Sequence, residues 1–280
     1  MQGPACSAAP PRPLPLRERA FPRATLGCPV LDDLLHGGLP CGSITEIVGE
    51  SGVGKTQLCL QACLSVQLPR ERGGLEGSSV YIYTEGDPPV KRLCELVERR
   101  VRRQLSHGSL PPLDNVLIDC DIASPKDLWV CINQLPNVIK GSSMRMPVRL
   151  VMIDSVANVF RDVSDRPTVT ELKERTSMMF RAAAVLKELA DRHNLAVLVV
   201  NQVADTMQGV NEELQSSGRG VLPSLGLAWS NCVNTRIFAS RTGQGLDASR
   251  KLQILFSPHL PPAACEYQIR PEGVVGLRTK

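Results

Sequence analysis

The sequence lacks the features of membrane-spanning, secreted and zinc-binding proteins. It contains no run of about 18 apolar residues, which excludes a transmembrane helix. The stretch from Met1 to Pro22 holds six prolines and no apolar block, so no secretory signal is expected. The ten cysteines include no CxxC pair, and His107, His193 and His259 have no partners at metal-ligand spacing. We therefore expect reduced intracellular thiols, with neither a disulfide framework nor zinc.

The composition is otherwise that of an ordinary globular chain. The 280 residues are 42% hydrophobic and 21% charged, enough to bury the core of one large domain. Lys and Arg number 32 against 28 Asp and Glu, so the net charge of +4 permits a nucleic-acid partner without requiring one. Aromatic residues make up only 4% of the chain, which leaves few side chains for stacking on bases.

Two regions differ in character. Residues 1–24 contain six prolines and four arginines, which exclude a regular helix and favour solvation, so this segment is interpreted as a flexible tail. Residues 25–280 show no internal repeat and no proline-rich linker. They are expected to form a single folded core.

Within the core, short β-rich apolar runs first alternate with amphipathic stretches. The predicted strands are 44–48, 80–83, 116–118, 150–153 and 197–200, and the predicted helices are 55–67, 88–106, 125–135 and 170–191. After residue 234 only strands follow, at 235–239, 252–256 and 267–269. This order predicts an α/β fold, a mostly parallel twisted sheet flanked by helices with an antiparallel C-terminal edge.

A phosphate-binding loop lies between the first predicted strand and helix. It matches GxxxxGK[ST] in full, as Gly49-Glu50-Ser51-Gly52-Val53-Gly54-Lys55-Thr56. The glycines allow successive backbone N–H groups and the helix N-terminus to surround an anion. Lys55 is expected to bridge the β- and γ-phosphates, and the Thr56 hydroxyl to bind Mg²⁺.

Three further polar residues follow predicted strands. Asp154 ends the run 150–153 and is expected to order the magnesium ion, while Glu85, after 80–83, is the candidate for polarising the attacking water. Gln202, after 197–200, could sense a γ-phosphate. Taken singly, Asp154 could instead mark a strand-end turn, Glu85 could be a solvated glutamate in a loop, and Gln202 could be a strand-end cap. The nearby phosphate-binding loop favours the catalytic interpretation.

Two segments could contact DNA, residues 161–166 and 207–222, because backbone contacts need only basic side chains and a flexible approach. The basic run 99–103 is more typical of a solvated helix face than of a binding patch.

The surroundings of the phosphate-binding loop carry a family resemblance. The approach Leu31-Asp32-Asp33-Leu34-Leu35-His36-Gly37-Gly38, the run 81–85, the run 150–155, Asn201-Gln202-Val203 and the segment 257–262 resemble the RecA-like recombinases of eukaryotes and archaea, in particular their paralogues. The resemblance covers residues 26–276. It implies a RecA-like P-loop NTPase core with ATP and Mg²⁺ as cofactors.

The resemblance also implies a biological role. It indicates homologous recombination, double-strand break and crosslink repair and Holliday junction processing, within a heterodimer with another recombinase paralogue (the "C" member). The strand-exchange recombinase filament and single-stranded and branched DNA would be further partners. The location would be the nucleus, with the cytoplasm and mitochondria as further compartments. Residues 257–261 would cap a nucleotide bound by a neighbouring subunit.

The chain departs from the family in two places. The family's small helical N-terminal domain is not expected here, because nothing before Gly27 could build it. Phe21-Pro22-Arg23-Ala24 matches the Phe-x-x-Ala polymerisation segment but lies closer to the core than usual, so a chance match is the preferred interpretation.

Three functions remain open at this point. The first is weak, DNA-dependent ATP hydrolysis, which would be incomplete in a lone subunit because the site is shared. The second is a nucleotide-gated scaffold that hardly cleaves ATP. The third, a kinase for a small substrate, is disfavoured because no lid or acceptor motif is visible and Asn201-Gln202 would go unexplained.

Overall fold

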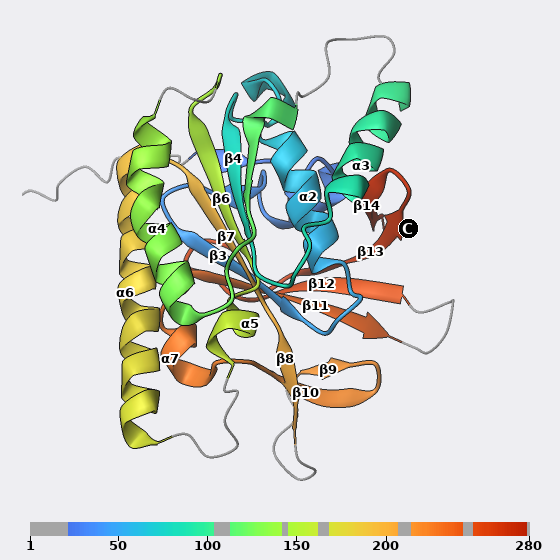
Figure 1. Ribbon diagram of the computed structural model, residues 1–280. Coiled ribbons are helices and arrows are strands. Elements are labelled where there is room, and N and C mark those ends of the chain that lie inside the picture. Colours follow the sequence, from blue (N-terminus) through green and yellow to red (C-terminus); the bar gives the residue numbers. More distant parts are fainter. Residues whose placement is uncertain are drawn as a thin grey trace, which may run out of the picture.

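A single large sheet runs through the molecule (Figure 1). The computed structural model describes residues 22–103, 113–141, 145–161, 168–206, 214–242 and 249–278, the side chains of 100–103 excepted. Within them the sheet has nine strands: β3 (Ile44–Gly49), β4 (Ser78–Tyr83), β5 (Val116–Asp119), β6 (Val148–Asp154), β7 (Ala196–Asn201), β11 (Thr235–Thr242), β12 (Ser249–Phe256), β13 (Ala264–Arg270) and β14 (Gly273–Leu277).

The strand order explains where a ligand site can form. It runs β14-β13-β12-β11-β3-β7-β6-β4-β5, and every pair from β11 to β5 is parallel. Strand β3 therefore lies in the middle of the sheet, between β11 and β7. The carboxyl ends of the parallel strands meet along one edge, and ligands of open α/β sheets bind at such an edge.

Helices cover both faces of the sheet. In Figure 1, α2 (Lys55–Ser65) and α3 (Val90–Arg103) lie on one side, and α4 (Pro125–Lys140) and α6 (Val169–His193) on the other. The short helices α5 (Val156–Phe160) and α7 (Gly226–Ser230) pack on the α4–α6 side. Each face consequently has its own hydrophobic core.

The side chains of residues 150–153 in β6 alternate between the two faces of the sheet, which explains why all four are apolar. Leu150 and Met152 belong to the core beneath α2, whereas Val151 and Ile153 belong to the core beneath α4 and α6. All four are fully buried. Successive side chains point to opposite faces of a strand, so a strand covered on both faces needs apolar residues at every position.

The C-terminal strands are antiparallel because they are joined without helices. Strands β12, β13 and β14 pair antiparallel, and only Pro271 and Glu272 separate β13 from β14. A parallel connection would need a crossover of a dozen or more residues. The expected fold class is confirmed, including its antiparallel edge, although β14 itself was not predicted.

The N-terminal part of the core begins earlier than the boundary expected at residue 25. Arg23–Ala24 form β1, which pairs with β2 (Leu39–Pro40), and Ala24 is 1% exposed. Helix α1 (Pro29–Leu34) follows and packs on β14. Arg23 and Ala24, assigned to the tail from composition, thus lie in the folded part. Residues 1–21, including Phe21 of the Phe-x-x-Ala match, lie outside the described residues.

Helices α4 and α6 extend beyond their predicted ranges, whereas α2 ends two residues before its predicted end and α3 begins two residues after its predicted start. Helix α4 continues to Lys140 despite Pro136, and its N-terminus is held by a capping box between Ser124 and Asp127. The corresponding box of α6 joins Thr168 and Glu171. No helix in the described ranges is long and apolar enough to cross a membrane.

A second, three-stranded sheet lies below the main one in Figure 1. It consists of β8 (Val203–Asp205), β9 (Gln215–Ser216) and β10 (Arg219–Pro223), paired antiparallel in the order β8-β10-β9. Strand β8 leaves the main sheet directly after β7 and Gln202. This small sheet contains the described part of the expected DNA segment 207–222 and was not predicted.

Candidate functional site

A cavity of about 750 Å³ opens at the carboxyl ends of the parallel strands. Most of the predicted site residues line it: Glu50, Ser51, Gly52, Gly54, Lys55, Thr56, Glu85, Asp154 and Gln202. The two remaining loop residues support it from beneath, since Gly49 is the last residue of β3 and Val53 is fully buried. The structure thus brings together side chains that are 150 residues apart in the chain.

The phosphate-binding loop adopts a backbone that favours glycine at two positions. Gly52 and Gly54 have φ values of 79° and 103°, and Gly54 is the N-cap of α2. A side chain at Gly54 would meet Ile269 Cδ1 at 2.7 Å. The Tyr267 hydroxyl donates to the Val53 carbonyl at 2.7 Å and holds the loop from below. The loop therefore presents the N-terminus of an eleven-residue helix to the cavity.

The Lys55 ammonium group lies against the backbone of this loop. Its Nζ donates to the Gly49 and Glu50 carbonyl oxygens, both at 2.8 Å. Burial lowers the pKa of Lys55, and the nearby Asp154 and Glu85 carboxylates oppose this shift. An ammonium group placed this way suits an anionic ligand, because a phosphate would supply the charge that the two neutral carbonyls lack.

Asp154 lies at the end of β6 beside Thr56. Its Oδ2 accepts hydrogen bonds from Thr56 Oγ1 at 2.8 Å and from the Tyr81 hydroxyl at 2.9 Å. Burial raises the pKa of Asp154, while these two hydrogen bonds act in the opposite direction. Tyr81, on β4, was expected only as a strand residue, because an aromatic residue in an apolar strand is indistinguishable from core.

Substituting Asp154 with asparagine should weaken the binding of ATP with Mg²⁺ while raising the thermal stability of the nucleotide-free protein. The raised pKa means that the ionised carboxylate destabilises the fold above that pKa, so Asp154→Asn is expected to raise the Tm of the nucleotide-free protein at pH 7. The affinity for ATP with Mg²⁺ should fall about 10–100-fold, as for other metal-supporting groups. Titrations with Mg²⁺ and with EDTA check this. Equal affinity of both proteins in Mg²⁺ would contradict it.

Glu85 and Gln202 meet across the cavity. Glu85 Oε1 accepts from Gln202 Nε2 at 2.7 Å and from Ser155 Oγ at 2.8 Å, and the Gln202 amide oxygen accepts from Arg161. These contacts join the ends of β4, β6 and β7. Displacement of Gln202 would therefore remove one of the two hydrogen bonds that Glu85 Oε1 accepts.

A buried network lies directly beneath this contact. Glu46, fully buried on β3, accepts from Asn201 Nδ2 at 2.7 Å and from Trp229 Nε1 at 2.9 Å, and its other oxygen pairs with Arg236. Asn201 also donates to the Ser224 carbonyl at 2.9 Å. The position of Gln202 therefore rests on a buried, hydrogen-bonded polar cluster that contains an ion pair.

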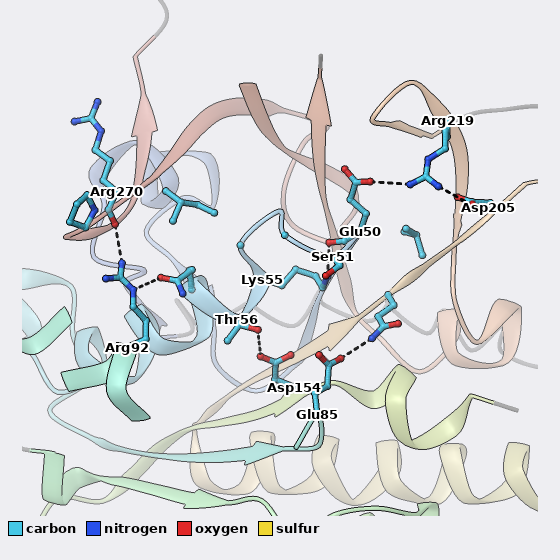
Figure 2. Close-up of a pocket in the computed structure, with 17 residues that line it drawn as sticks. Glu50, Ser51, Lys55, Thr56, Glu85, Arg92, Asp154, Asp205, Arg219 and Arg270 are labelled. Atoms are coloured by element: carbon cyan, nitrogen blue, oxygen red, sulfur yellow. Dashed lines mark hydrogen bonds and ion pairs between the residues drawn. The ribbon is translucent and has the colours of Figure 1, made fainter. Parts of the chain in front are cut away.

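The two ends of the cavity carry arginines that were not predicted for the nucleotide site, although Arg219 belongs to the expected DNA segment 207–222. At one end Arg92 donates to Gln57 Oε1 at 2.9 Å and to the Arg270 carbonyl at 3.0 Å. At the other end Arg219 lies near Glu50 and Asp205 (Figure 2). Lys55, Thr56, Asp154 and Glu85 lie between these ends in the same view. Single arginines outside a motif give no sequence signal.

The remaining sequence predictions fall outside the cavity or outside the described residues. The segment 257–262 follows β12 beside the amino end of β3, as Thr235 pairs with Thr45 and contacts Ser257, so it lies away from the phosphate-binding loop. Residues 162–166 and 207–213 of the expected DNA segments are not among the described residues. Arg99 is exposed on α3, and the rest of that basic run is not described at side-chain level.

The donor set fits ATP with Mg²⁺. The described residues contain no group of three His, Cys, Asp or Glu that could hold a metal ion unaided. Mg²⁺ typically uses one or two protein oxygens together with substrate phosphates and waters, which Thr56 and Asp154 could supply. The cavity, the half-buried Lys55 ammonium and the N-terminus of α2 provide the matching phosphate site.

Comparison with known proteins identifies the family. The family model described as Rad51 matches residues 17–277 of this chain. The chain belongs to the Rad51 family. This confirms the resemblance to RecA-like recombinases, and the match includes all of the cavity residues described above.

The relatives found include the paralogues within the Rad51 family. The chain is 38% identical to "DNA repair protein XRCC3 homolog" of Arabidopsis thaliana, over 91% of this chain and 93% of the relative. It is 36% identical to "DNA repair protein XRCC3" of Mus musculus, over 93% and 78%. It is 34% identical to "DNA repair protein RAD51 homolog 2" of Homo sapiens, over 91% and 68%.

Proposed function

We propose that this chain is an ATP-binding recombinase paralogue that acts in homologous recombination DNA repair, with weak DNA-stimulated hydrolysis. The observation that supports this most is the meeting of Lys55, Asp154, Glu85 and Gln202 in one cavity of a Rad51-family chain. The names of the relatives, which are DNA repair proteins, support the biological setting.

The proposed binding roles follow from the contacts. Lys55 and the N–H groups of residues 50–55 would hold the phosphates, and Thr56 and Asp154 would hold Mg²⁺. Bound Mg²⁺ would neutralise charge on the β- and γ-phosphates. Arg92, at the far end of the cavity from Glu50, would face the base, where a guanidinium plane can stack on a ring.

Hydrolysis would depend on Glu85. Its carboxylate would orient a water and accept the water proton, and Gln202, bonded to the same oxygen, would report the γ-phosphate to β8 and the segment beyond it. Of the guanidinium groups that line the cavity, Arg92 is bonded to Gln57 and Arg270 to Gln268, and Arg219 lies beyond Glu50 at the end of the cavity. The transition-state charge would therefore need a cation from a neighbouring subunit, which explains why the lone chain should be slow.

The proposed partners are a second recombinase paralogue, which would complete the ATP site, the strand-exchange recombinase filament, and single-stranded and branched DNA. Residues 257–262 lie away from this chain's own cavity, a position that suits contact with a nucleotide bound by a neighbour. Repair of double-strand breaks and crosslinks and processing of Holliday junctions would place the protein in the nucleus.

Co-purification with the paralogue partner, with and without ATP, tests the proposal. We expect a heterodimer that ATP strengthens, followed by ATP turnover that single-stranded DNA stimulates. A tight heterodimer without turnover would favour the alternative function, a scaffold that uses ATP as a structural ligand. Absence of any heterodimer would contradict the proposed assembly.

Changing Glu85 to glutamine separates the two functions. The amide keeps an oxygen that can accept from Ser155 and Gln202 but cannot take a proton. Turnover by the assembled complex should fall at least about 100-fold, the usual contribution of a general base. Repair complementation in cells lacking the protein is the second measurement. Loss of complementation supports catalysis, and full complementation supports the scaffold.

The matched control is Glu188→Gln on α6. Glu188 is 58% exposed, pairs with Arg192 and lies outside the cavity, so this substitution makes the same chemical change away from the site. Turnover and complementation should equal those of the unmodified protein.

A further inference from the structure

The Glu50 side chain is not used by the proposed ATP chemistry. Its backbone belongs to the phosphate-binding loop, but its carboxylate turns away from Lys55 toward β10 (Figure 2). The side chain is only 11% exposed. Its oxygens lie 3.5 Å from Arg219 Nη2 and 3.8 Å from Arg241 Nε, and one accepts from the Ser217 hydroxyl. One carboxylate thus faces two guanidinium groups and one hydroxyl.

The hairpin of β9 and β10 is attached to the main sheet at this point. Ser217 N donates to the Arg241 carbonyl at 2.8 Å, and Arg241 N donates to Ser216 Oγ at 3.0 Å. Arg241 also reaches the Ser51 carbonyl at 3.4 Å. The hairpin, the end of β11 and the phosphate-binding loop therefore form one contiguous contact centred on Glu50.

The charges around Glu50 indicate that another anion could replace its carboxylate on the two arginines. Arg241 lies directly opposite Arg250 in the β11–β12 pair, a like-charge juxtaposition that is unfavourable without a counter-ion. Arg219 divides its bonds between Glu50 and Asp205, and its side chain is 57% exposed. The two Glu50–guanidinium contacts are long, at 3.5 and 3.8 Å, whereas a phosphate can take a short, bidentate pair of charge-assisted hydrogen bonds from an arginine.

We propose that Glu50 is a latch that holds Arg219 and Arg241 away from nucleic acid, and that these two arginines are phosphate contacts for single-stranded DNA once the latch opens. The choice of single-stranded DNA as the ligand rests on the proposed function. DNA phosphates would replace the Glu50 carboxylate on the same guanidinium groups. Because Glu50 is part of the phosphate-binding loop, the nucleotide site and the DNA-contacting hairpin would be linked directly, in addition to the contact through Gln202.

The test is the salt dependence of DNA binding by the full chain. A fluorescent 30-nucleotide oligo-dT would be titrated without nucleotide, at several salt concentrations, into the unmodified protein, Glu50→Gln and the control Glu188→Gln. Each phosphate contact adds about 0.7 to the slope of log K against log salt for single strands. Glu50→Gln should steepen the slope by about 0.7 to 1.4 and, near about 0.2 M salt, strengthen binding about threefold per added contact.

A double-variant cycle assigns the gain to the arginines. In an Arg219→Gln background, Glu50→Gln should add no more than the Arg241 contact, and in an Arg219→Gln, Arg241→Gln background it should add nothing. Asp205→Asn, an exposed change that frees Arg219 from its second partner, should give a smaller gain of the same sign. This variant keeps the idea testable if Glu50→Gln folds poorly.

The outcomes distinguish the latch from the proposed function. Equal slopes for the unmodified protein, Glu50→Gln and Asp205→Asn, with measurable DNA binding, would overturn the latch alone. A gain that persists without both arginines would also overturn it. A change only in the affinity for a non-hydrolysable ATP analogue would assign the arginines to nucleotide phosphates instead. Failure of every variant to bind DNA would contradict the latch and the DNA-binding part of the proposed function together.

Discussion

Replacing Lys55 with alanine is expected to abolish nucleotide binding while leaving the fold intact. The ammonium group would contribute charge-assisted hydrogen bonds to two phosphates, each of about 1.5–3 kcal/mol. Losing both corresponds to at least a 100-fold loss of affinity, since about 1.4 kcal/mol is tenfold. Among the described residues, Lys55 donates hydrogen bonds to two backbone carbonyls, and burial lowers its pKa, so the cation contributes little to stability.

Binding of a labelled ATP analogue and thermal unfolding are the two measurements for this variant. The control is Lys140→Ala, which removes an exposed lysine from the last residue of α4, at the amino end of the neighbouring strand β6. Unchanged analogue binding by Lys55→Ala would show that the phosphate-binding loop is not the nucleotide site.

Replacing Glu46 with glutamine is expected to produce the largest loss of stability among single substitutions near the site. Glu46 is fully buried, and Arg236, its partner on β11, is 6% exposed. Removing the carboxylate charge leaves the guanidinium buried without a counter-ion, at a cost of about 3–5 kcal/mol. For a chain of this size the Tm should fall on the order of 10 °C. Denaturant and thermal unfolding measure the change.

The double variant Glu46→Gln, Arg236→Met tests the cause. It buries no unpaired charge, so it should be less destabilised than Glu46→Gln alone. The exposed pair Glu188–Arg192 serves as comparison, and Glu188→Gln should cost less than about 1 kcal/mol. A double variant as unstable as the sum of the two single changes would show that the pair acts through shape and not through charge.

Much of the fold was predictable because its strands are buried on both faces. Runs such as residues 150–153 are apolar at every position, and a strand between two helical layers requires that pattern. The loop at Gly49–Thr56 was predictable for a different reason, since its glycines, lysine and threonine are consecutive and each has a local task. Its position after a strand and before a helix then placed Asp154, Glu85 and Gln202 at the same edge of the sheet.

The contacts around this loop were not predictable, because they join residues with no local relation. Glu46 and Arg236 are 190 positions apart, and their neighbours in the sequence are ordinary strand residues. Arg92 looks like any surface arginine until α3 is placed at one end of the cavity, and Arg219, although part of an expected DNA segment, gave no sign that its hairpin would lie at the other end. Nothing in the sequence around Ser217 and Gly218 predicts that the Ser217 hydroxyl donates to the Glu50 carboxylate.

The sequence by itself determined the class of fold, the phosphate-binding loop, the residues that follow the parallel strands and membership of the recombinase family. These depend on periodicity and on short motifs, whose physical causes act within a few residues. The tertiary structure alone decided how Glu85 is shared between Gln202 and Ser155, what supports Gln202 from beneath, and where the carboxylate of Glu50 points. Hydrogen bonds and ion pairs need distances of a few ångströms, and only the packing of distant strands sets those distances.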